Sequence, residues 1–228
     1  MKGLGDEPFL YGYPIQLKKP VDDIEQLITC LQPVSLRLTL NKGKSINLIT
    51  STNENKYEKE CVVILLVKGE IDLWSVVTDR RLVAVFQAPA VFGLMGSSFR
   101  NEIYKITPKS GCEVYYLSRD VALDRIAKQG LIREVLSYYS YMSDYQTRSS
   151  NLLINRTSYE IVCALLQEIN AIPYEKRIKI SVINYILVRS KLARSGVAKI
   201  LSDLRFGGYI EIQYGKLKGI LKRFPCVY

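Results

Sequence analysis

The 228-residue chain contains no histidine. Histidine is the side chain most often used as a general base near neutral pH, the commonest zinc ligand and the usual axial ligand of haem. The sequence also shows no paired carboxylates and no glycine-rich phosphate loop, which further argues against an enzyme. We therefore expect no catalytic residues, no metal site and no cofactor.

Cysteine is scarce and dispersed, and no two cysteines form a CxxC pair. An odd number of scattered cysteines is typical of reduced thiols rather than of a disulfide framework or a zinc or iron-sulfur site. Cys112 is the best candidate for a redox-active thiol, although a packing role in a buried position is favoured. The five cysteines are Cys30, Cys61, Cys112, Cys163 and Cys226.

No apolar run reaches the roughly 18 to 20 residues that a membrane-spanning helix needs. The first residues, MKGLGDEPFLYGYP, carry acids and prolines where a signal peptide would have its apolar segment. We therefore expect a cytoplasmic protein with no membrane partner.

The positive charge is concentrated in the last quarter of the chain. Residues 1–172 carry 20 Lys and Arg against 19 Asp and Glu, whereas residues 173–228 carry 12 against 3, a net charge of +9. Basic side chains placed near phosphates release condensed counterions, which favours binding to nucleic acid. The uneven distribution therefore indicates that the C-terminal part binds a polyanion.

The first half of the chain favours β-structure. Residues 21–31 have apolar side chains at helical spacing, and residues 34–117 then alternate short apolar runs with polar or glycine-containing stretches. This pattern predicts a leading helix followed by an antiparallel β-barrel or jelly roll. The expected strands cover residues 35–40, 61–67, 71–77, 82–86 and 112–117.

Helical periodicity begins after residue 117. Ser118 is a plausible N-cap for a helix over residues 121–129, and Gly130 separates this helix from a longer one over residues 131–153. The longer helix has two neighbouring apolar stripes, so we expect one to pack on the barrel and the other to form a dimer, with a wholly intramolecular helix as the alternative. We assign dimerisation to Val135, Tyr138, Met142, Tyr145 and Leu152, and the neighbouring stripe contains Ile132, Leu136, Tyr139 and Leu153.

Residues 158–210 have the spacing of a helix-turn-helix with one preceding helix. Thr157 is expected to cap a helix over residues 158–170, and apolar residues between 186 and 204 fall where two short helices would pack at a steep angle. The second of these helices is expected to run from Arg194 to Phe206, with small or basic residues facing outward. Lys191 occupies the turn, where glycine is usual, so the turn either holds a left-handed lysine or differs in shape.

A β-hairpin wing is expected after Gly207 and Gly208, with residues 214–216 as its turn. Helix residues would contact bases, and wing lysines would contact phosphates. There are two alternatives: a generic three-helix core with a basic hairpin, and a protein-interaction module whose winged helix binds an acidic partner instead of duplex DNA. The predicted DNA contacts are Arg189, Lys191, Arg194, Ser195, Lys199, Ser202, Lys216, Lys218 and Lys222.

The segment ARSGVAKILSDL, residues 193–204, resembles the recognition helix of the family of the cyclic-AMP receptor protein and the fumarate-nitrate regulator. The order of barrel, long helix and winged helix is similar as well. The resemblance implies a dimeric transcription regulator that binds double-stranded DNA, with RNA polymerase as a candidate further partner. It also places Arg194 and Lys199 at base-contacting positions, whereas Ser195 stands where many members carry Glu, so the target sequence does not transfer.

A narrower resemblance rests on four segments that match the enterobacterial IprA (YaiV) group, which is associated with inhibition of hydrogen peroxide resistance. It implies control of oxidative-stress or virulence genes. The segments are QAPAVFGL at 87–94, NRTSY at 155–159, VINYI at 182–186 and GYIEIQYGKL at 208–217.

The sensor half departs from the cyclic-nucleotide pattern. Binding a cyclic phosphate needs backbone donors, a cation and an acceptor for the ribose hydroxyl, yet Leu94 follows Gly93 where the family has Glu, and residues 101–107 lack an Arg-Ser or Arg-Thr pair. We therefore expect no response to cyclic nucleotides. An unknown apolar ligand, thiol-based sensing and loss of the effector all stay open. A candidate effector pocket comprises Phe92, Gly93, Leu94 and Met95.

The sequence as a whole predicts an α+β chain. We expect an N-terminal antiparallel β-barrel of the cyclic-nucleotide-binding type at residues 1–130, a dimerisation helix at 131–154, and a winged helix-turn-helix at 155–228. The expected function is that of a homodimeric DNA-binding transcription regulator.

Overall fold

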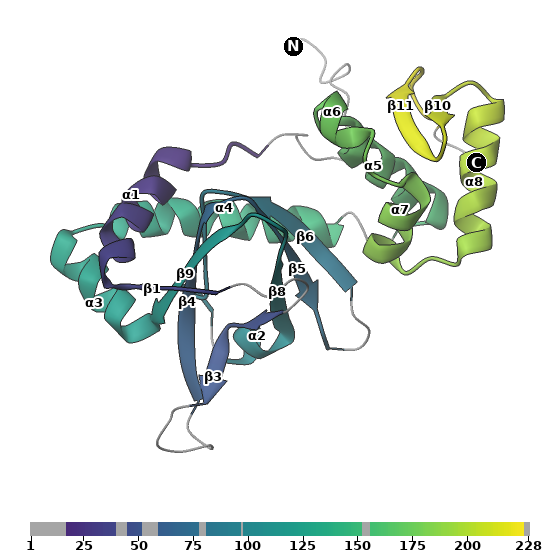
Figure 1. Cartoon of the computed structure of the whole chain (residues 1–228). Helices are drawn as coiled ribbons and strands as arrows, with labels where there is room; N and C mark the ends of the chain where they lie inside the picture. Colours follow the sequence, from purple (N-terminus) through teal and green to yellow (C-terminus); the bar gives the residue numbers. More distant parts are fainter. Residues whose placement is uncertain are drawn as a thin grey trace, which may run out of the picture. The chain divides into compact units, whose positions relative to one another are not determined.

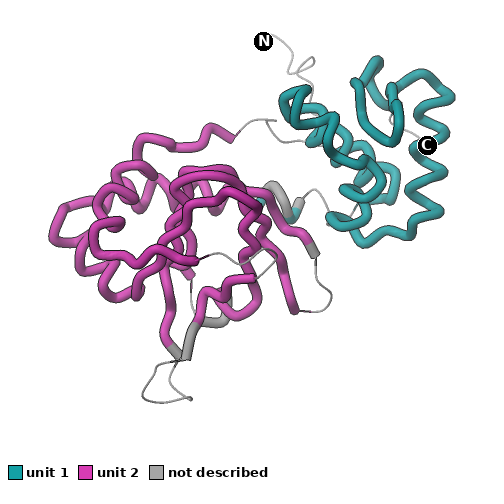
Figure 2. Tube along the Cα trace, viewed as in Figure 1, with its two compact units in different colours: residues 1–16, 146–228 teal, residues 17–145 magenta. Residues whose placement is uncertain are grey.

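The computed structural model describes residues 17–39, 45–51, 59–77, 81–96, 98–151 and 156–225. These residues form two compact units, one of residues 17–145 and one of the described residues from 146 onward (Figures 1 and 2). None of the helices in the described ranges is both long enough and apolar enough to cross a membrane.

The first unit contains two antiparallel sheets and three longer helices. One sheet has the strand order β1-β9-β4-β3, with β7 also paired to β4, and the other has the order β2-β8-β5-β6. The helices, including the one-turn 3-10 helix η1, are α1 (Val21–Leu31), η1 (Gln32–Val34), α2 (Ser98–Ile103), α3 (Arg119–Gln129) and α4 (Ile132–Asn151). The strands are β1 (Leu36–Arg37), β2 (Ile46–Asn47), β3 (Ile49–Ser51), β4 (Lys59–Lys68), β5 (Glu70–Ser75), β6 (Arg81–Gln87), β7 (Ala90–Phe92), β8 (Tyr104–Pro108) and β9 (Glu113–Ser118).

Strand β4 is buried on both faces, which explains its uninterrupted apolar run. Val62, Ile64 and Leu66 point into a core that both sheets share. Val63 and Leu65, which alternate with them, point to the opposite face and pack against helices. Because successive side chains of a strand lie on opposite faces, this one strand joins two hydrophobic cores.

Helices α1, α3 and α4 supply the second core, on the face of the β4 sheet away from the other sheet (Figure 1). Ile24, Leu27 and Leu31 of α1 are fully buried there, as the helical spacing of residues 21–31 requires. Helix α3 ends at Gly130, which adopts the left-handed conformation typical of a helix C-terminus.

Tyr138 fixes how α4 is rotated against this unit. Its hydroxyl donates a hydrogen bond to the carbonyl oxygen of Val91 at 2.7 Å and accepts one from the Val91 amide at 3.3 Å. The side chain is only 1% exposed, and burial raises the pKa of Tyr138 well above its ordinary value. One tyrosine therefore satisfies both backbone groups of Val91 in strand β7.

The second unit contains four helices and one hairpin, in the order expected of a winged helix-turn-helix (Figure 1). Its elements are α5 (Ser158–Asn170), α6 (Tyr174–Arg177), α7 (Val182–Ser190), α8 (Arg194–Phe206), β10 (Ile210–Gln213) and β11 (Lys216–Ile220).

The α+β fold class is confirmed, and so are the helices at 21–31 and 194–206, with the expected ends. The expected strand at 35–40 is limited to Leu36 and Arg37 in the described part of that range, and residue 40 lies outside the described residues. Ser118 stands at the N-cap of α3, as expected, but makes no side-chain capping hydrogen bond. Several short elements were not anticipated: η1, α2, α6, β2, β3, β7 and β8.

Removal of the Tyr138 hydroxyl tests how much the contact with Val91 stabilises the fold. Tyr138→Phe leaves a buried amide and a buried carbonyl without this partner, so we expect a loss of about 1 to 3 kcal/mol in the free energy of unfolding. Urea denaturation followed by circular dichroism measures this loss. Tyr214→Phe is the control, because Tyr214 belongs to the second unit, is 92% exposed, and should change stability by about 0.5 kcal/mol at most. Equal effects of the two substitutions would contradict the assignment.

Candidate nucleic-acid interface

The winged helix-turn-helix is held together by one continuous hydrophobic core. Helices α5, α7 and α8 and both strands of the hairpin contribute to it. At the start of α5, Thr157 and Glu160 form the expected cap: the Thr157 hydroxyl accepts from the Glu160 amide, and the Glu160 carboxylate accepts from the Thr157 amide. The hydrogen bonds that the Glu160 carboxylate accepts from the Thr157 amide and hydroxyl, aided by the charge of Arg156, lower the pKa of Glu160.

The turn between α7 and α8 contains a left-handed lysine. Lys191 has a φ of 60°, and its amide donates to the carbonyl of Leu187 at 3.0 Å. The hydroxyl of Ser190 donates to Ile186 and accepts from the Leu192 amide, which supports the turn from inside. The turn therefore keeps its usual shape with a lysine in the position where glycine is usual, and the Lys191 side chain is exposed.

Helix α8 has one buried face and one exposed face. Val197, Ile200, Leu201 and Leu204 are buried in the core. The four positions of this helix predicted to contact DNA are all exposed and are small or basic, and Asp203 and Phe206 are exposed as well. These four positions are Arg194, Ser195, Lys199 and Ser202. A helix of this kind can enter a DNA groove without steric conflict.

The hairpin carries the three predicted wing lysines, but two of them also contact the protein. The Lys216 ammonium donates to the Lys179 carbonyl at 2.9 Å. The Lys218 ammonium donates to the Tyr174 hydroxyl at 3.0 Å and lies 5.5 Å from the centre of the Tyr174 ring. Lys222, just beyond β11, is exposed and lies 5.9 Å from the centre of the Tyr209 ring.

Arg177, which the sequence did not single out, ties the hairpin to the helices. Its guanidinium donates twice to Asn170, to the carbonyl and to the side-chain oxygen, both at 2.7 Å, and once to the carbonyl of Lys218 at 2.9 Å. The C-terminal end of α5 and strand β11 are thereby held by one side chain. Arg177 lies in a cluster of basic residues, and charge alone could not distinguish it from its exposed neighbours.

Arg189 was predicted to contact DNA, and this prediction is wrong. Its side chain is only 3% exposed and forms an ion pair with Glu168, with nitrogen-oxygen distances of 3.1 and 3.2 Å. A buried guanidinium needs such a partner, because burying an unpaired charge is costly. Arg189 therefore joins α7 to α5 inside the domain.

The residues assigned to dimerisation lie on the stripe of α4 that packs inside the chain, so that assignment is corrected. Tyr138 is buried, Val135 and Met142 pack on the helical core, and the Tyr145 ring lies 5.1 Å from Phe86 of the core between the sheets. Leu152 lies outside the described residues. The neighbouring stripe is the exposed one, with Ile132 at 54%, Leu136 at 60% and Tyr139 at 48%.

The four residues proposed as an effector pocket are mainly packing residues. Phe92 is buried between the two sheets, whereas Leu94 is buried in the helical core, with Met95 packed beside it. Gly93 has a φ of 80°, and a Cβ there would lie 2.0 Å from the carbonyl oxygen of Val62. A residue without a Cβ is therefore required at position 93, where the backbone passes close to β4.

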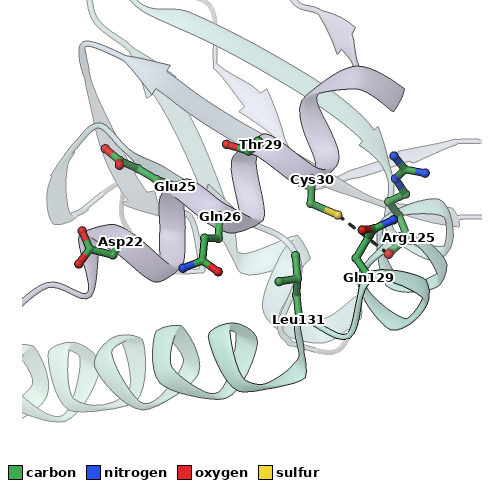
Figure 3. A pocket seen from close by; sticks show the side chains of 8 residues that line it. All are labelled: Asp22, Glu25, Gln26, Thr29, Cys30, Arg125, Gln129 and Leu131. Atoms are coloured by element: carbon green, nitrogen blue, oxygen red, sulfur yellow. Dashed lines mark hydrogen bonds between the residues drawn. The ribbon is translucent and has the colours of Figure 1, made fainter.

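A shallow polar pocket of about 650 Å³ lies between α1, α3 and the start of α4 (Figure 3). Cys30 lies at its edge and points its sulfur toward the carbonyl oxygen of Arg125 at 4.0 Å. No group of three metal-ligating side chains occurs among the described residues, in this pocket or elsewhere. The lining residues are Asp22, Glu25, Gln26, Thr29, Cys30, Arg125, Gln129 and Leu131.

Cys112 is tied to the backbone of the β5 strand. Its thiol donates to the Glu70 carbonyl at 2.9 Å and lies 3.2 Å from the Glu70 amide, from which it accepts. It is partly buried and packs on the core between the sheets. This environment agrees with the packing role that was favoured for it.

Comparisons with known proteins agree with this architecture. Residues 158–226 match the family described as winged helix-turn-helix DNA binding. The solved structure of CLP, a c-di-GMP-responsive global regulator of Xanthomonas campestris, is similar with a TM-score of 0.65 and 12% identity, over 88% of this chain and 100% of CLP. A CRP/FNR-family regulator from Eubacterium rectale is similar with a TM-score of 0.56 and 13% identity, over 86% and 90% of the two chains.

The structural neighbours establish the fold, which is that of CRP/FNR regulators, and a curated relative establishes the family. The inhibitor of hydrogen peroxide resistance of Salmonella typhimurium is 33% identical over 218 residues, which cover 94% of this chain and 100% of the relative. The chain belongs to the family of the inhibitor of hydrogen peroxide resistance.

Proposed function

We propose that the chain is a cytoplasmic, homodimeric transcription regulator that binds duplex DNA through α8 and the β10–β11 hairpin. The observation that carries this proposal is the exposed side of α8, where Arg194, Ser195, Lys199 and Ser202 lie beside a lysine-bearing hairpin. Residues 173–228 hold 12 basic side chains and 3 acidic ones, so this face lies in the most basic part of the chain. Phosphate contacts by such residues favour DNA over a neutral partner.

Within this interface, Arg194 is the residue proposed to recognise a base. It stands at the first turn of α8, and Lys199 follows five residues later, about 7.5 Å along the axis. The two side chains share a groove only if the helix enters obliquely with its first turn deepest. The planar guanidinium of Arg194 can then make two hydrogen bonds to a guanine edge. Lys191 and Lys222, which are exposed, and the wing lysines Lys216 and Lys218 would contact phosphates.

A competition assay with specific and random duplexes tests this division. Arg194→Ala should remove about 1 to 3 kcal/mol of sequence discrimination and leave part of the salt-sensitive background. Lys222→Ala should weaken both kinds of binding about equally and reduce the salt slope by about one. If Arg194→Ala keeps full sequence preference, α8 does not recognise the bases. If the wild-type protein shows no salt-sensitive DNA binding, an acidic protein becomes the favoured partner.

We also propose that the exposed stripe of α4 forms the dimer interface. Ile132, Leu136 and Tyr139 recur at intervals of four and three residues, the spacing of a coiled-coil seam. The other stripe is already used within the chain, so of the two stripes of α4 this is the one left to pair with a second copy. Large apolar side chains exposed in a row on one helix are typical of an interaction surface.

The double variant Ile132→Glu/Leu136→Glu should give a folded monomer, because two carboxylates would be forced into the apolar seam. Light scattering measures the mass, and circular dichroism checks the fold. Leu123→Glu is the control: Leu123 on α3 is 43% exposed, outside the stripe, and its replacement should leave the dimer intact. A double variant that is folded and still dimeric would show that the interface lies elsewhere.

We further propose that DNA binding does not depend on a cyclic nucleotide. Leu94 offers no hydrogen-bonding group to a ribose, and it is buried. Met142 and Tyr145 of α4 pack on the core between the two sheets, so the chain's own side chains occupy the space next to that core.

Isothermal titration calorimetry with cyclic AMP at micromolar protein should therefore show no binding heat, and cyclic AMP should not change the affinity for DNA. The known cyclic-AMP receptor protein serves as the positive control for the ligand. Saturable binding of one nucleotide per chain would overturn our interpretation of the Gly93 region.

The name of the curated relatives motivates a proposal about the controlled genes. We propose that they affect resistance to hydrogen peroxide. Sequencing the DNA that is immunoprecipitated with the protein from cells would identify them.

A further inference from the structure

The tip of the wing combines backbone strain with full exposure. The hairpin turn has two central residues, Tyr214 with a φ of 49° and Gly215 with a φ of 71°. Two-residue turns with two positive φ values favour Gly, Asn and Asp, because other side chains are strained there. Tyr214 nevertheless occupies the first position, and it is 92% exposed. It therefore gains almost no stabilisation from burial to offset this strain.

The turn is also anchored, so the direction of Tyr214 is set by the rest of the domain. The carbonyl of Gly215 accepts a hydrogen bond from the amide of Val182 at 3.0 Å. Val182 is the first residue of α7, whose N-cap residue Ser181 makes no side-chain capping bond. The wing tip thus caps α7, and the Lys216 ammonium adds a second link to the Lys179 carbonyl.

We infer that Tyr214 is a DNA contact, placed by this anchored turn against the sugar-phosphate backbone beside the groove that α8 enters; the inference rests on the proposed DNA-binding function. A phenol hydroxyl can donate to a phosphate oxygen, while the ring packs on the adjacent sugar. Strained residues that persist without a packing reason are concentrated at ligand contacts. The neighbouring cations Lys216 and Lys218 lie on the same hairpin and select a polyanion as the ligand.

The contribution of Tyr214 has a signature that separates it from the lysines. An uncharged side chain releases no counterions, so its loss lowers affinity without changing the dependence on salt. Loss of a lysine lowers the slope of affinity against salt concentration as well. The two kinds of contact are therefore distinguishable in one titration series.

The test is Tyr214→Asn in the full-length protein, assayed with a duplex that the wild-type protein binds. Asn is favoured in the left-handed turn, so the unfolding midpoint should stay the same or rise. Affinity for the duplex should fall about tenfold, as expected for loss of a hydrogen bond to a charged group, with an unchanged salt slope. Gln213→Ala, at the exposed neighbouring position, is the control and should keep wild-type affinity.

The outcomes distinguish this inference from the function on which it rests. A wild-type protein that binds no DNA would refute the proposed function itself. A DNA-binding wild type with an equally tight Tyr214→Asn variant would overturn the inference alone, as would a loss of affinity with a changed salt slope. Tyr214→Phe then separates the two parts of the contact: full affinity would overturn the hydroxyl-phosphate bond.

Discussion

Helix α4 has two apolar stripes, and a single chain can bury only one of them. The choice is made by Tyr138, whose hydroxyl engages both backbone groups of Val91 and so fixes the rotation of the helix. Tyr145 then packs beside Phe86 of the core between the sheets, and Leu136 is left in solvent. The rotation of α4 thus determines both which side chains fill the interior of the first unit and which apolar side chains remain exposed.

In the winged helix-turn-helix, two arginines make contacts inside the domain, whereas Lys191, Arg194, Lys199 and Lys222 are exposed. Arg189 is paired with Glu168, and Arg177 is bonded to Asn170 and to the carbonyl of Lys218. Both arginines hold helices or strands in place through these contacts, and Arg189 is buried. The packing of α5 against α7 and against the hairpin therefore depends in part on internal cations, whereas the proposed affinity for DNA rests on Arg194, Lys199 and the lysines.

The sequence predicted the elements whose periodicity is long and uniform. The helix at 21–31 and the helix at 194–206 have apolar residues at regular helical intervals, and β4 is a continuous apolar run, so each could be identified without tertiary information. Strands of two to five residues, such as β2 and β8, are too short to show a period, and their pairing partners are distant in the chain.

Only part of the candidate site could be predicted from the sequence. Exposed residues of α8 follow from the helical period, but Arg189 was misplaced because charge does not reveal a buried partner. The stripe of α4 that packs inside the chain was predicted to be the exposed one, because periodicity gives the width of the apolar face of a helix but not which part of that face turns toward the core.

The packing of α4 also constrains how any signal could reach the DNA-binding half. A ligand changes a conformational equilibrium only by the difference between its affinities for the two states. With Met142 and Tyr145 packed on the core between the sheets, a ligand entering there would first have to displace them and then compensate for the contacts that they lose. The cost grows because Tyr138 belongs to the same rigid helix, so moving α4 also leaves the amide and carbonyl of Val91 without their partner. In this chain α4 is therefore held against the first unit by its own side chains.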